Sequence, residues 1–468
     1  MFNPPASELD RRIMPFKKTG EPSHLPSPNN GLETAQTNRS LAAIFRMRSK
    51  TRAGVFRFGG ILAGFVIAVA GMAQGGDWPQ LLGPSRDGRA APDESLPDSI
   101  APQGPVAAWS QNIGSGYAGP IVSGESVYLF HRRGEDELVS CWAQSDGKLR
   151  WETKLKAEYR GGIDSDIGPR CVPCLVGQDL VVYGAAGQLS CLDPADGKVR
   201  WSISLRKDFK ADDGYFGAGS TPLVLEDRII INVGSRQAGI VAVARSDGKV
   251  LWKSTSYEAS YSSPVALQYQ GKPLVLVETR LNLVGLRPED GEVAFELPFG
   301  MRGPTVNAAT PIGLPDNKWF LTASYGIGAC LIDLNNSPPK VIYRNDELLA
   351  SQYVTPVAIG NFVYAVNGRE DMGGGEVCCL DPLAEKVKWS DGSIGIAHLI
   401  AVGNRVLAVS TQGEVSIFEA DPESFKKLAS FQLPQATYRA MPALAKGRLW
   451  VRSNDGRGGG KLLAIELK

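Results

Sequence analysis

The sequence lacks an excess of charge of either sign. Its 50 Lys and Arg residues face 49 Asp and Glu residues, which leaves a formal net charge of +1. Proteins that hold nucleic acid or an anionic membrane surface usually depend on a strongly basic field, because such contacts release counterions. We therefore expect no nucleic-acid partner, and contact with a membrane only through an uncleaved N-terminal segment.

Histidine is nearly absent. Only His24, His131 and His398 occur, which argues against a histidine-based zinc site. No GxSxG motif precedes a helical pattern, so a Ser-His-acid triad of that type is also excluded. We expect no metal site and assign no catalytic residue.

Cysteine occurs seven times, an odd number. At least one cysteine must then stay free or pair outside the chain, and no disulfide framework can be inferred. Cys171 and Cys174 have the spacing of a metal or redox pair, but no second Cys or His pair follows at ligand spacing. We interpret both as residues of one innermost strand, on opposite faces of it.

Long hydrophobic runs are limited to one, from about Phe58 to Ala73. Roughly sixteen residues is short of the twenty or so that a membrane span needs. Five basic residues between 46 and 57 precede the run, and Gly71 and Ala73 supply small residues after it, a pattern typical of an export signal. We assign residues 46–75 to a signal peptide or N-terminal anchor, and expect an exported protein, periplasmic or secreted.

Residues 1–45 differ in composition from the rest of the chain. They are rich in Pro, Ser, Asn and charge and have no apolar period, so we expect them to be a disordered leader. The signal would have a conventional length if translation began at Met47, which makes residues 1–46 a candidate for a misassigned start. No Cys follows the apolar run, so we expect no lipid-modified N-terminus.

The remainder of the chain repeats one pattern. Segments 145–151, 195–201 and 246–252 have the sequences SDGKLRW, ADGKVRW and SDGKVLW, and residues 289–295 are EDGEVAF. Each joins an Asp-Gly turn to a strand that ends in an aromatic residue. A second mark recurs every 42 to 53 residues, a proline that opens a hydrophobic strand, or Leu399 in its place. Eight units result.

Within a unit, four short strands rich in Val, Ile, Tyr and Trp are separated by Gly, Asp and Asn turns. Repeats of this length made of four strands are typical of propeller blades. We predict an all-β fold, an eight-bladed β-propeller of four-stranded antiparallel blades over residues 105–468, preceded by an extended segment, 76–104. Because the last unit ends before a fourth strand, we predict that residues 105–113 complete that blade and close the ring.

These repeats carry a family resemblance. The aromatic-ended tail [AS]DGKxxW, after a strand of the CLD type, resembles the PQQ-like propeller repeat that quinoprotein alcohol dehydrogenases share with outer-membrane assembly-factor scaffolds. The segment DWPQLLGPSRDG, residues 77–88, is similar to the start of many secreted bacterial members of that group. The resemblance covers residues 77–468 and is specific for fold but not for function.

The resemblance draws attention to Cys378 and Cys379, because the quinone-dependent enzymes of the superfamily carry a disulfide between neighbouring cysteines beside the cofactor. In this sequence VCCLDP aligns Cys379 with Cys191 of SCLDP and with Cys141 of SCWAQ. We therefore interpret the pair as residues of a regular third strand, which does not offer the distorted turn that such a disulfide needs.

Loops that lead into the innermost strands converge on one end of a propeller's axis, the default ligand site of such a fold. His398 stands where other units have Thr or Ser before that strand. Aromatic and charged residues in these loops suit a polar ligand, a sugar or an extended peptide. The candidate ligand-binding residues are Tyr117, Arg160, Asp164, Asp166, Arg170, Tyr215, Tyr261, Tyr353, His398 and Arg439. The alternative is an internal ion-pair network that fills the channel. The loop 367–376 projects on the same face and carries Arg369, Glu370 and Asp371. Its carboxylates offer a site for a partner or calcium, but it lacks the alternating Asp pattern of a calcium loop, and we interpret it as a mobile connection.

Two classes of function fit. In the first, the protein is an exported, monomeric, non-catalytic binding or assembly scaffold for a protein or polysaccharide of the cell envelope, with no cofactor. In the second, which the resemblance implies, it is a PQQ-dependent alcohol or polyol dehydrogenase that also binds calcium. Hydrolysis or lyase chemistry by Asp164, Asp166 and Arg170 is a third hypothesis, which rests only on their clustering.

Overall fold

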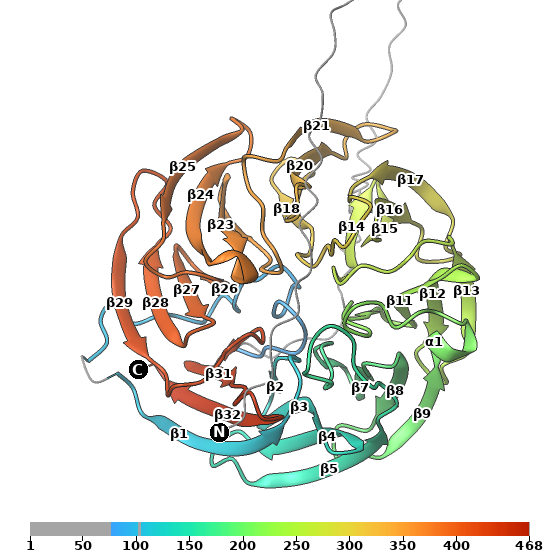
Figure 1. Cartoon of the computed structure of the whole chain (residues 1–468), viewed down its shortest axis with the longest axis horizontal. Helices are drawn as coiled ribbons and strands as arrows, with labels where there is room; N and C mark the ends of the chain where they lie inside the picture. The colour runs from blue at the N-terminus through green and yellow to red at the C-terminus, as the bar shows by residue number, and fades with distance from the viewer. Residues whose placement is uncertain (1–75, 102–103, 468) are drawn as a thin grey trace, which may run out of the picture. The chain divides into compact units, whose positions relative to one another are not determined.

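The computed structural model describes residues 76–101 and 104–467, and within them the chain forms eight four-stranded antiparallel sheets arranged as a ring (Figure 1). This confirms the predicted eight-bladed propeller. The predicted leader, 1–45, and the predicted signal or anchor, 46–75, lie outside the described residues. No helix in the described part of the chain has the length and apolar character that a membrane span needs.

The first four blades follow one another along the chain. Blade one consists of β2 (Ile121–Ser123), β3 (Ser126–Arg133), β4 (Asp136–Ala143) and β5 (Leu149–Lys156). Blade two consists of β6 (Cys174–Val176), β7 (Asp179–Tyr183), β8 (Gln188–Leu192) and β9 (Val199–Ser204), followed by the short helix α1 (Leu205–Asp208). Blade three consists of β10 (Leu223–Val224), β11 (Arg228–Ser235), β12 (Ala238–Ala244) and β13 (Val250–Ser254), and blade four of β14 (Val265–Tyr269), β15 (Lys272–Glu278), β16 (Asn282–Leu286) and β17 (Val293–Pro298).

The other four blades complete the ring. Blade five consists of β18 (Ile312–Leu314), β19 (Lys318–Ala323), β20 (Gly328–Asp333) and β21 (Lys340–Asn345). Blade six consists of β22 (Val357–Ile359), β23 (Phe362–Arg369), the 3-10 turn η1 (Glu370–Met372), β24 (Gly374–Asp381) and β25 (Lys386–Asp391). Blade seven consists of β26 (Ala397–Val402), β27 (Arg405–Ser410), β28 (Glu414–Glu419) and β29 (Lys427–Gln432), and blade eight of β30 (Ala443–Ala445), β31 (Arg448–Arg452), β32 (Gly459–Glu466) and β1 (Ala107–Gly114).

Neighbouring blades meet through the Asp-Gly turns and the aromatic strand ends of the repeat. Gly147 has a φ of +71°, in the left-handed region that favours glycine, and a Cβ built on it would lie 2.6 Å from the Trp109 ring of the preceding blade. The same contact recurs at Gly197 with Trp151, Gly248 with Trp201 and Gly291 with Trp252. The indole Nε1 of each of these tryptophans donates to a backbone carbonyl of the next blade over 2.9 to 3.1 Å. The repeated motif is therefore the joint between blades.

Ring closure follows the same rule. Strand β1 pairs antiparallel with β32, from Ala107 opposite Ile465 to Gly114 opposite Gly459. The blade therefore has the order β1-β32-β31-β30, and the prediction that the N-terminal strand completes the last blade is confirmed. Because Trp109 of β1 contacts the turn of blade one, the first strand of the propeller also makes the joint that closes the circle.

The leading segment crosses the ring near its axis (Figure 1). The backbone of Trp78 bridges to Val122 of blade one, and that of Arg89 to Ala401 of blade seven. The Arg86 guanidinium is buried and donates to the carbonyls of Thr221 and Pro264, before the innermost strands of blades three and four, over 2.6 and 2.8 Å. This segment ties distant blades together and covers one end of the channel.

The cysteines are all buried and free. Cys378 and Cys379 are consecutive residues of β24, and their side chains belong to two different hydrophobic clusters, on opposite sides of the strand. Cys174 begins β6, whereas Cys171 precedes it, and both pack in one cluster. The expectation that Cys171 and Cys174 share a strand and face opposite sides was therefore wrong, because the strand begins later than the sequence indicated.

Replacing Trp109 by Ala tests the closing joint. We expect Trp109→Ala to lower the free energy of unfolding by about 3–5 kcal/mol, the usual cost of removing a large buried aromatic side chain. Denaturant unfolding measures the change. The neighbouring Val106, 84% exposed, supplies the control Val106→Ala, and equal midpoints for the two variants would contradict the role assigned to Trp109.

Glu137 of β4 makes stability depend on pH. Its carboxylate is buried and accepts one hydrogen bond, from the Ala185 N–H at 3.0 Å, and burial raises its pKa from 4.5 to about 7. The native state then binds more protons than the unfolded chain between these values. Stability from this group is therefore present below pH 4.5 and is lost as the pH rises to about 7.

We expect Glu137→Gln, which cannot ionise, to be more stable than the wild type at pH 8, by a difference on the order of 3 kcal/mol at most. The two proteins should unfold at similar denaturant concentrations at pH 4. A stability difference that stays the same at both pH values would show that ionisation of Glu137 is not its cause.

Candidate functional site

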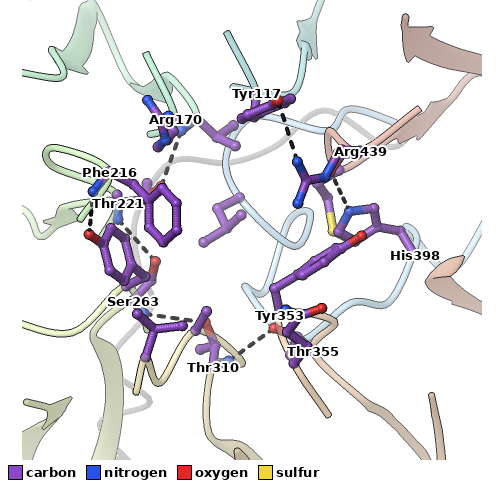
Figure 2. A pocket seen from close by; sticks show the side chains of 18 of the residues that line it. Tyr117, Arg170, Phe216, Thr221, Ser263, Thr310, Tyr353, Thr355, His398 and Arg439 are labelled. Atoms are coloured by element: carbon purple, nitrogen blue, oxygen red, sulfur yellow. Dashed lines mark hydrogen bonds between the residues drawn. The ribbon is translucent and has the colours of Figure 1, made fainter. Parts of the chain in front are cut away.

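A pocket of about 240 Å³ lies on the propeller axis, where the loops that lead into the innermost strands meet (Figure 2). We call it the funnel. Leu81 and Leu82 of the leading segment line it together with residues from the surrounding blades, so the segment that covers one end of the channel also forms part of the pocket wall. The funnel is therefore a pocket rather than an open pore.

Hydroxyl groups form an arc along one side of the funnel. The backbone N–H before each innermost strand donates to the hydroxyl of the equivalent residue in the next blade: Val172 to Thr221, Thr221 to Ser263, Ser263 to Thr310, and Thr310 to Thr355, over 3.0 to 3.3 Å. All four hydroxyl residues line the funnel. Each hydroxyl oxygen accepts from the backbone, and a hydroxyl that accepts one hydrogen bond can also donate one.

Aromatic rings and arginines line the funnel as well. The Arg439 guanidinium lies 5.0 Å from the ring centre of Tyr117 and 5.7 Å from that of Tyr353. Arg170 lies 5.6 Å from the ring of Tyr117 and 5.9 Å from that of Phe216. These distances allow cation–π attraction, which holds both the rings and the charges in place.

The arginines are paired with carboxylates. Arg439 contacts Glu370 over 2.9 Å and Asp164 over 3.8 Å, and Arg170 contacts Asp164 over 3.9 Å. Arg170 is itself 9% exposed and also donates to two backbone carbonyls of its own loop. Two cations thus face two anions. The ion-pair network predicted as an alternative is present on one wall, and the funnel remains open beside it.

His398 lies in the funnel wall beside Tyr353 and Arg439. Its Nε2 lies 2.9 Å from the Arg439 carbonyl, and its ring centre is 5.9 Å from that of Tyr353. Burial lowers the pKa of His398, so the ring is neutral at pH 7 and Nε2 can donate to that carbonyl. His398 therefore adds no charge to the funnel.

The structure brings seven of the ten predicted site residues into the funnel wall, namely Tyr117, Asp164, Arg170, Tyr261, Tyr353, His398 and Arg439. The other three lie elsewhere. Arg160 is exposed and pairs with Glu135 over 2.6 Å. Asp166 accepts hydrogen bonds from the Gly116 N–H and the Asn454 side-chain amide, and it does not line the funnel. Tyr215 lines a separate cavity.

Sequence reasoning missed four groups at the funnel. Phe216, Tyr325 and Gln352 line the pocket, and Glu370 accepts hydrogen bonds from Tyr353 and Arg439. Glu370 belongs to the loop 367–376, for which the sequence pattern favoured a connection over a binding role. Its place in a loop on the face where the other candidates lie was the available signal.

The funnel lining has few side chains that could hold a metal ion or the implied cofactor. Its lining has a single carboxylate, Asp164, which two arginines already engage. Within residues 76–101 and 104–467, no three His, Cys, Asp or Glu side chains gather to hold a metal ion. The adjacent cysteines lie apart in separate clusters. These residues therefore do not fit the cofactor arrangement that the resemblance implies, a quinone held against a vicinal disulfide with calcium on carboxylate oxygens.

The sequence is similar to that of a known protein family. A family model described as outer membrane protein assembly factor BamB matches residues 135–391, more than half of the chain. The chain belongs to this PQQ-like propeller family. No curated protein is similar enough in sequence to match it.

Solved structures similar to this PQQ-like propeller include very different proteins. BamB from Moraxella catarrhalis is 15% identical with a TM-score of 0.56, over 77% of this chain and 98% of that one. A europium-containing methanol dehydrogenase is 12% identical with a TM-score of 0.60, over 82% and 90%. Saccharomyces cerevisiae Sqt1 is 12% identical with a TM-score of 0.54, over 78% and 100%. At such low identity these structures share the fold, and function must be argued from the site.

The hydroxyl arc can be tested at Thr310, whose Oγ1 accepts from the Ser263 N–H. We expect Thr310→Val to lower the free energy of unfolding by about 1–3 kcal/mol, because it leaves a buried N–H without an acceptor. Thr310→Ser keeps the hydroxyl and is the matched control. If the Val and Ser variants lose the same stability in denaturant unfolding, the hydrogen bond contributes nothing.

Proposed function

We propose that this protein is an exported, non-catalytic binding module that receives a neutral, polar segment of a protein or polysaccharide of the cell envelope in its funnel. The observation that carries the proposal is the pairing of Arg170 and Arg439 with Asp164 and Glu370. Because these charges are already paired, the funnel offers a ligand aromatic faces and hydroxyl donors, the combination that sugars and extended peptides need.

The place of action is part of the same proposal. The basic residues followed by an apolar run before residue 75 are typical of an export signal. The matching family model is described as an outer membrane assembly factor, which supports a role in the cell envelope. Because β1 completes the last blade, no blade is left for a second copy to finish, in keeping with a monomer.

The second candidate, a PQQ-dependent alcohol or polyol dehydrogenase, rests on likeness of fold. A europium-containing methanol dehydrogenase shares the architecture. The funnel residues give this candidate less support, because the adjacent cysteines are separated and Asp164 is engaged by Arg170 and Arg439. Hydrolysis or lyase chemistry has less support still, since Asp166 lies behind the loop that carries Asp164.

Tyr117 and Tyr353 provide the test of binding, because their rings line the funnel. We expect Tyr117→Ala and Tyr353→Ala each to weaken retention of an envelope glycan or protein at least tenfold, since stacking on an aromatic face is lost. Binding is measured by glycan array and by pull-down from envelope extract, which separate the two kinds of partner.

Tyr257, which lies outside the funnel and donates to Glu296, gives the control Tyr257→Ala. Retention unchanged in both funnel variants would move the binding site away from the axis. Added pyrroloquinoline quinone and calcium should give no dye reduction with alcohols. Quinone absorbance together with alcohol-dependent dye reduction would replace the proposal with the dehydrogenase.

A further inference from the structure

A second cavity, of about 190 Å³, lies beside the funnel on the same face of the propeller. Residues 206–220, between blades two and three, line it together with residues 258–261 and 305–307 from the next two connections. Tyr261 lines both pockets, and its hydroxyl accepts from the Phe216 N–H over 2.9 Å. We call this second pocket the side cavity.

Arg206 of α1 is the unusual group in the side cavity. Its side chain is 7% exposed and lines the cavity wall. In the part of the chain that the structure describes, this guanidinium forms no ion pair and donates no hydrogen bond, and its buried Nε–H has no acceptor. A buried cation without a partner is costly, so such groups normally face a counterion.

The fold holds Arg206 in this position. A Cβ built on Gly187 would lie 2.1 Å from the Arg206 Cγ, so the absence of a side chain at Gly187 makes room for the arginine stem. The hydroxyls of Tyr159 and Tyr183 are buried and also have no hydrogen-bond partner. Burial raises the pKa of Tyr183, and the positive charge of Arg206 opposes this rise.

The remaining charges in the side cavity identify the kind of ligand. Arg280 is paired with Glu258 over 2.6 Å, so the charges of these two lining residues cancel. Arg206 is then left as one cation with two exposed carboxylates, Asp212 and Asp213. A dianion such as phosphate would meet more repulsion than attraction from this set. A molecule with one carboxylate and one ammonium group matches it.

We propose that the side cavity binds a small zwitterion of the α-amino acid class, with its carboxylate on Arg206 and its ammonium group toward Asp212 and Asp213. A guanidinium is well suited to a carboxylate, because its N–H groups match the two oxygens. The side cavity is much larger than the space that one water requires. This site is independent of the partner proposed for the funnel.

The test is a thermal-unfolding screen of the full-length protein with each of the common α-amino acids at millimolar concentration. Each amino acid is compared with its amide, which lacks the carboxylate, and with the matching carboxylic acid, which lacks the amine. We expect at least one amino acid to raise the melting temperature saturably, and neither of its analogues to do so at the same concentration. Inorganic phosphate should have no saturable effect.

Arg206→Met should weaken the binding of that amino acid at least tenfold, because a charge-assisted contact is lost. Arg133→Met removes an exposed arginine elsewhere and should bind like the wild type. Should Arg206→Met fail to fold, the exposed pair Asp212→Asn and Asp213→Asn still tests the ammonium contact and should reduce the preference for the amino acid over its matching carboxylic acid.

Three results would overturn the proposal. The first is a wild type that no amino acid stabilises saturably. The second is equal affinity in the wild type and in Arg206→Met. The third is stabilisation by phosphate as strong as that by the best amino acid, which would make the side cavity a general anion site.

Discussion

The structure depends on the contact between an indole ring and a glycine turn in the next blade. A side chain at Gly147, Gly197 or Gly248 would occupy the space that the neighbouring tryptophan fills. The same glycines have positive φ values, so the turn geometry and the packing between blades both require glycine at these positions. A single short motif thus shapes the hairpin and sets the distance to the preceding sheet.

This joint also explains how the ring tolerates changes in the sequence of the repeat. In blade six the aromatic end of the outer strand is retained as Trp389, whose Nε1 donates to the Asp421 carbonyl of blade seven over 2.8 Å, although the facing turn has no Asp-Gly pair. The hydrogen bond therefore persists where the glycine is lost. Packing between sheets keeps the blades in register, while the loops at the axis are free to carry different side chains.

The sequence allowed the ring to be predicted because its signals are local. A turn, a strand and an aromatic end recur within a few residues, and the incomplete last repeat indicates the closing partner of residues 105–113. Positions three residues before the recurring prolines also indicated the funnel residues Tyr117, Arg170, Tyr261, Tyr353 and Arg439, because the repeat fixes where those loops point.

Features without a repeat could not be predicted in the same way. Asp164 and Asp166 are two residues apart in one loop, yet one faces the funnel and the other a backbone amide. The contribution of Leu81 and Leu82 to the funnel wall depends on the path of the leading segment, which has no counterpart in other blades. Arg206 lies in a helical insertion, α1, that blade two alone possesses among the described residues.

The position of the leading segment limits what shape of molecule the funnel can accept. Because residues 76–101 run across the hub and Arg86 is fastened to two blades there, a long polymer has no exit on the far side. Only a chain end, a branch or a sharply bent loop can be inserted, and it must leave by the mouth through which it came. If the proposed ligand binds on this axis, it must therefore enter as an end, a branch or a bend, because the leading segment leaves it no passage through the ring.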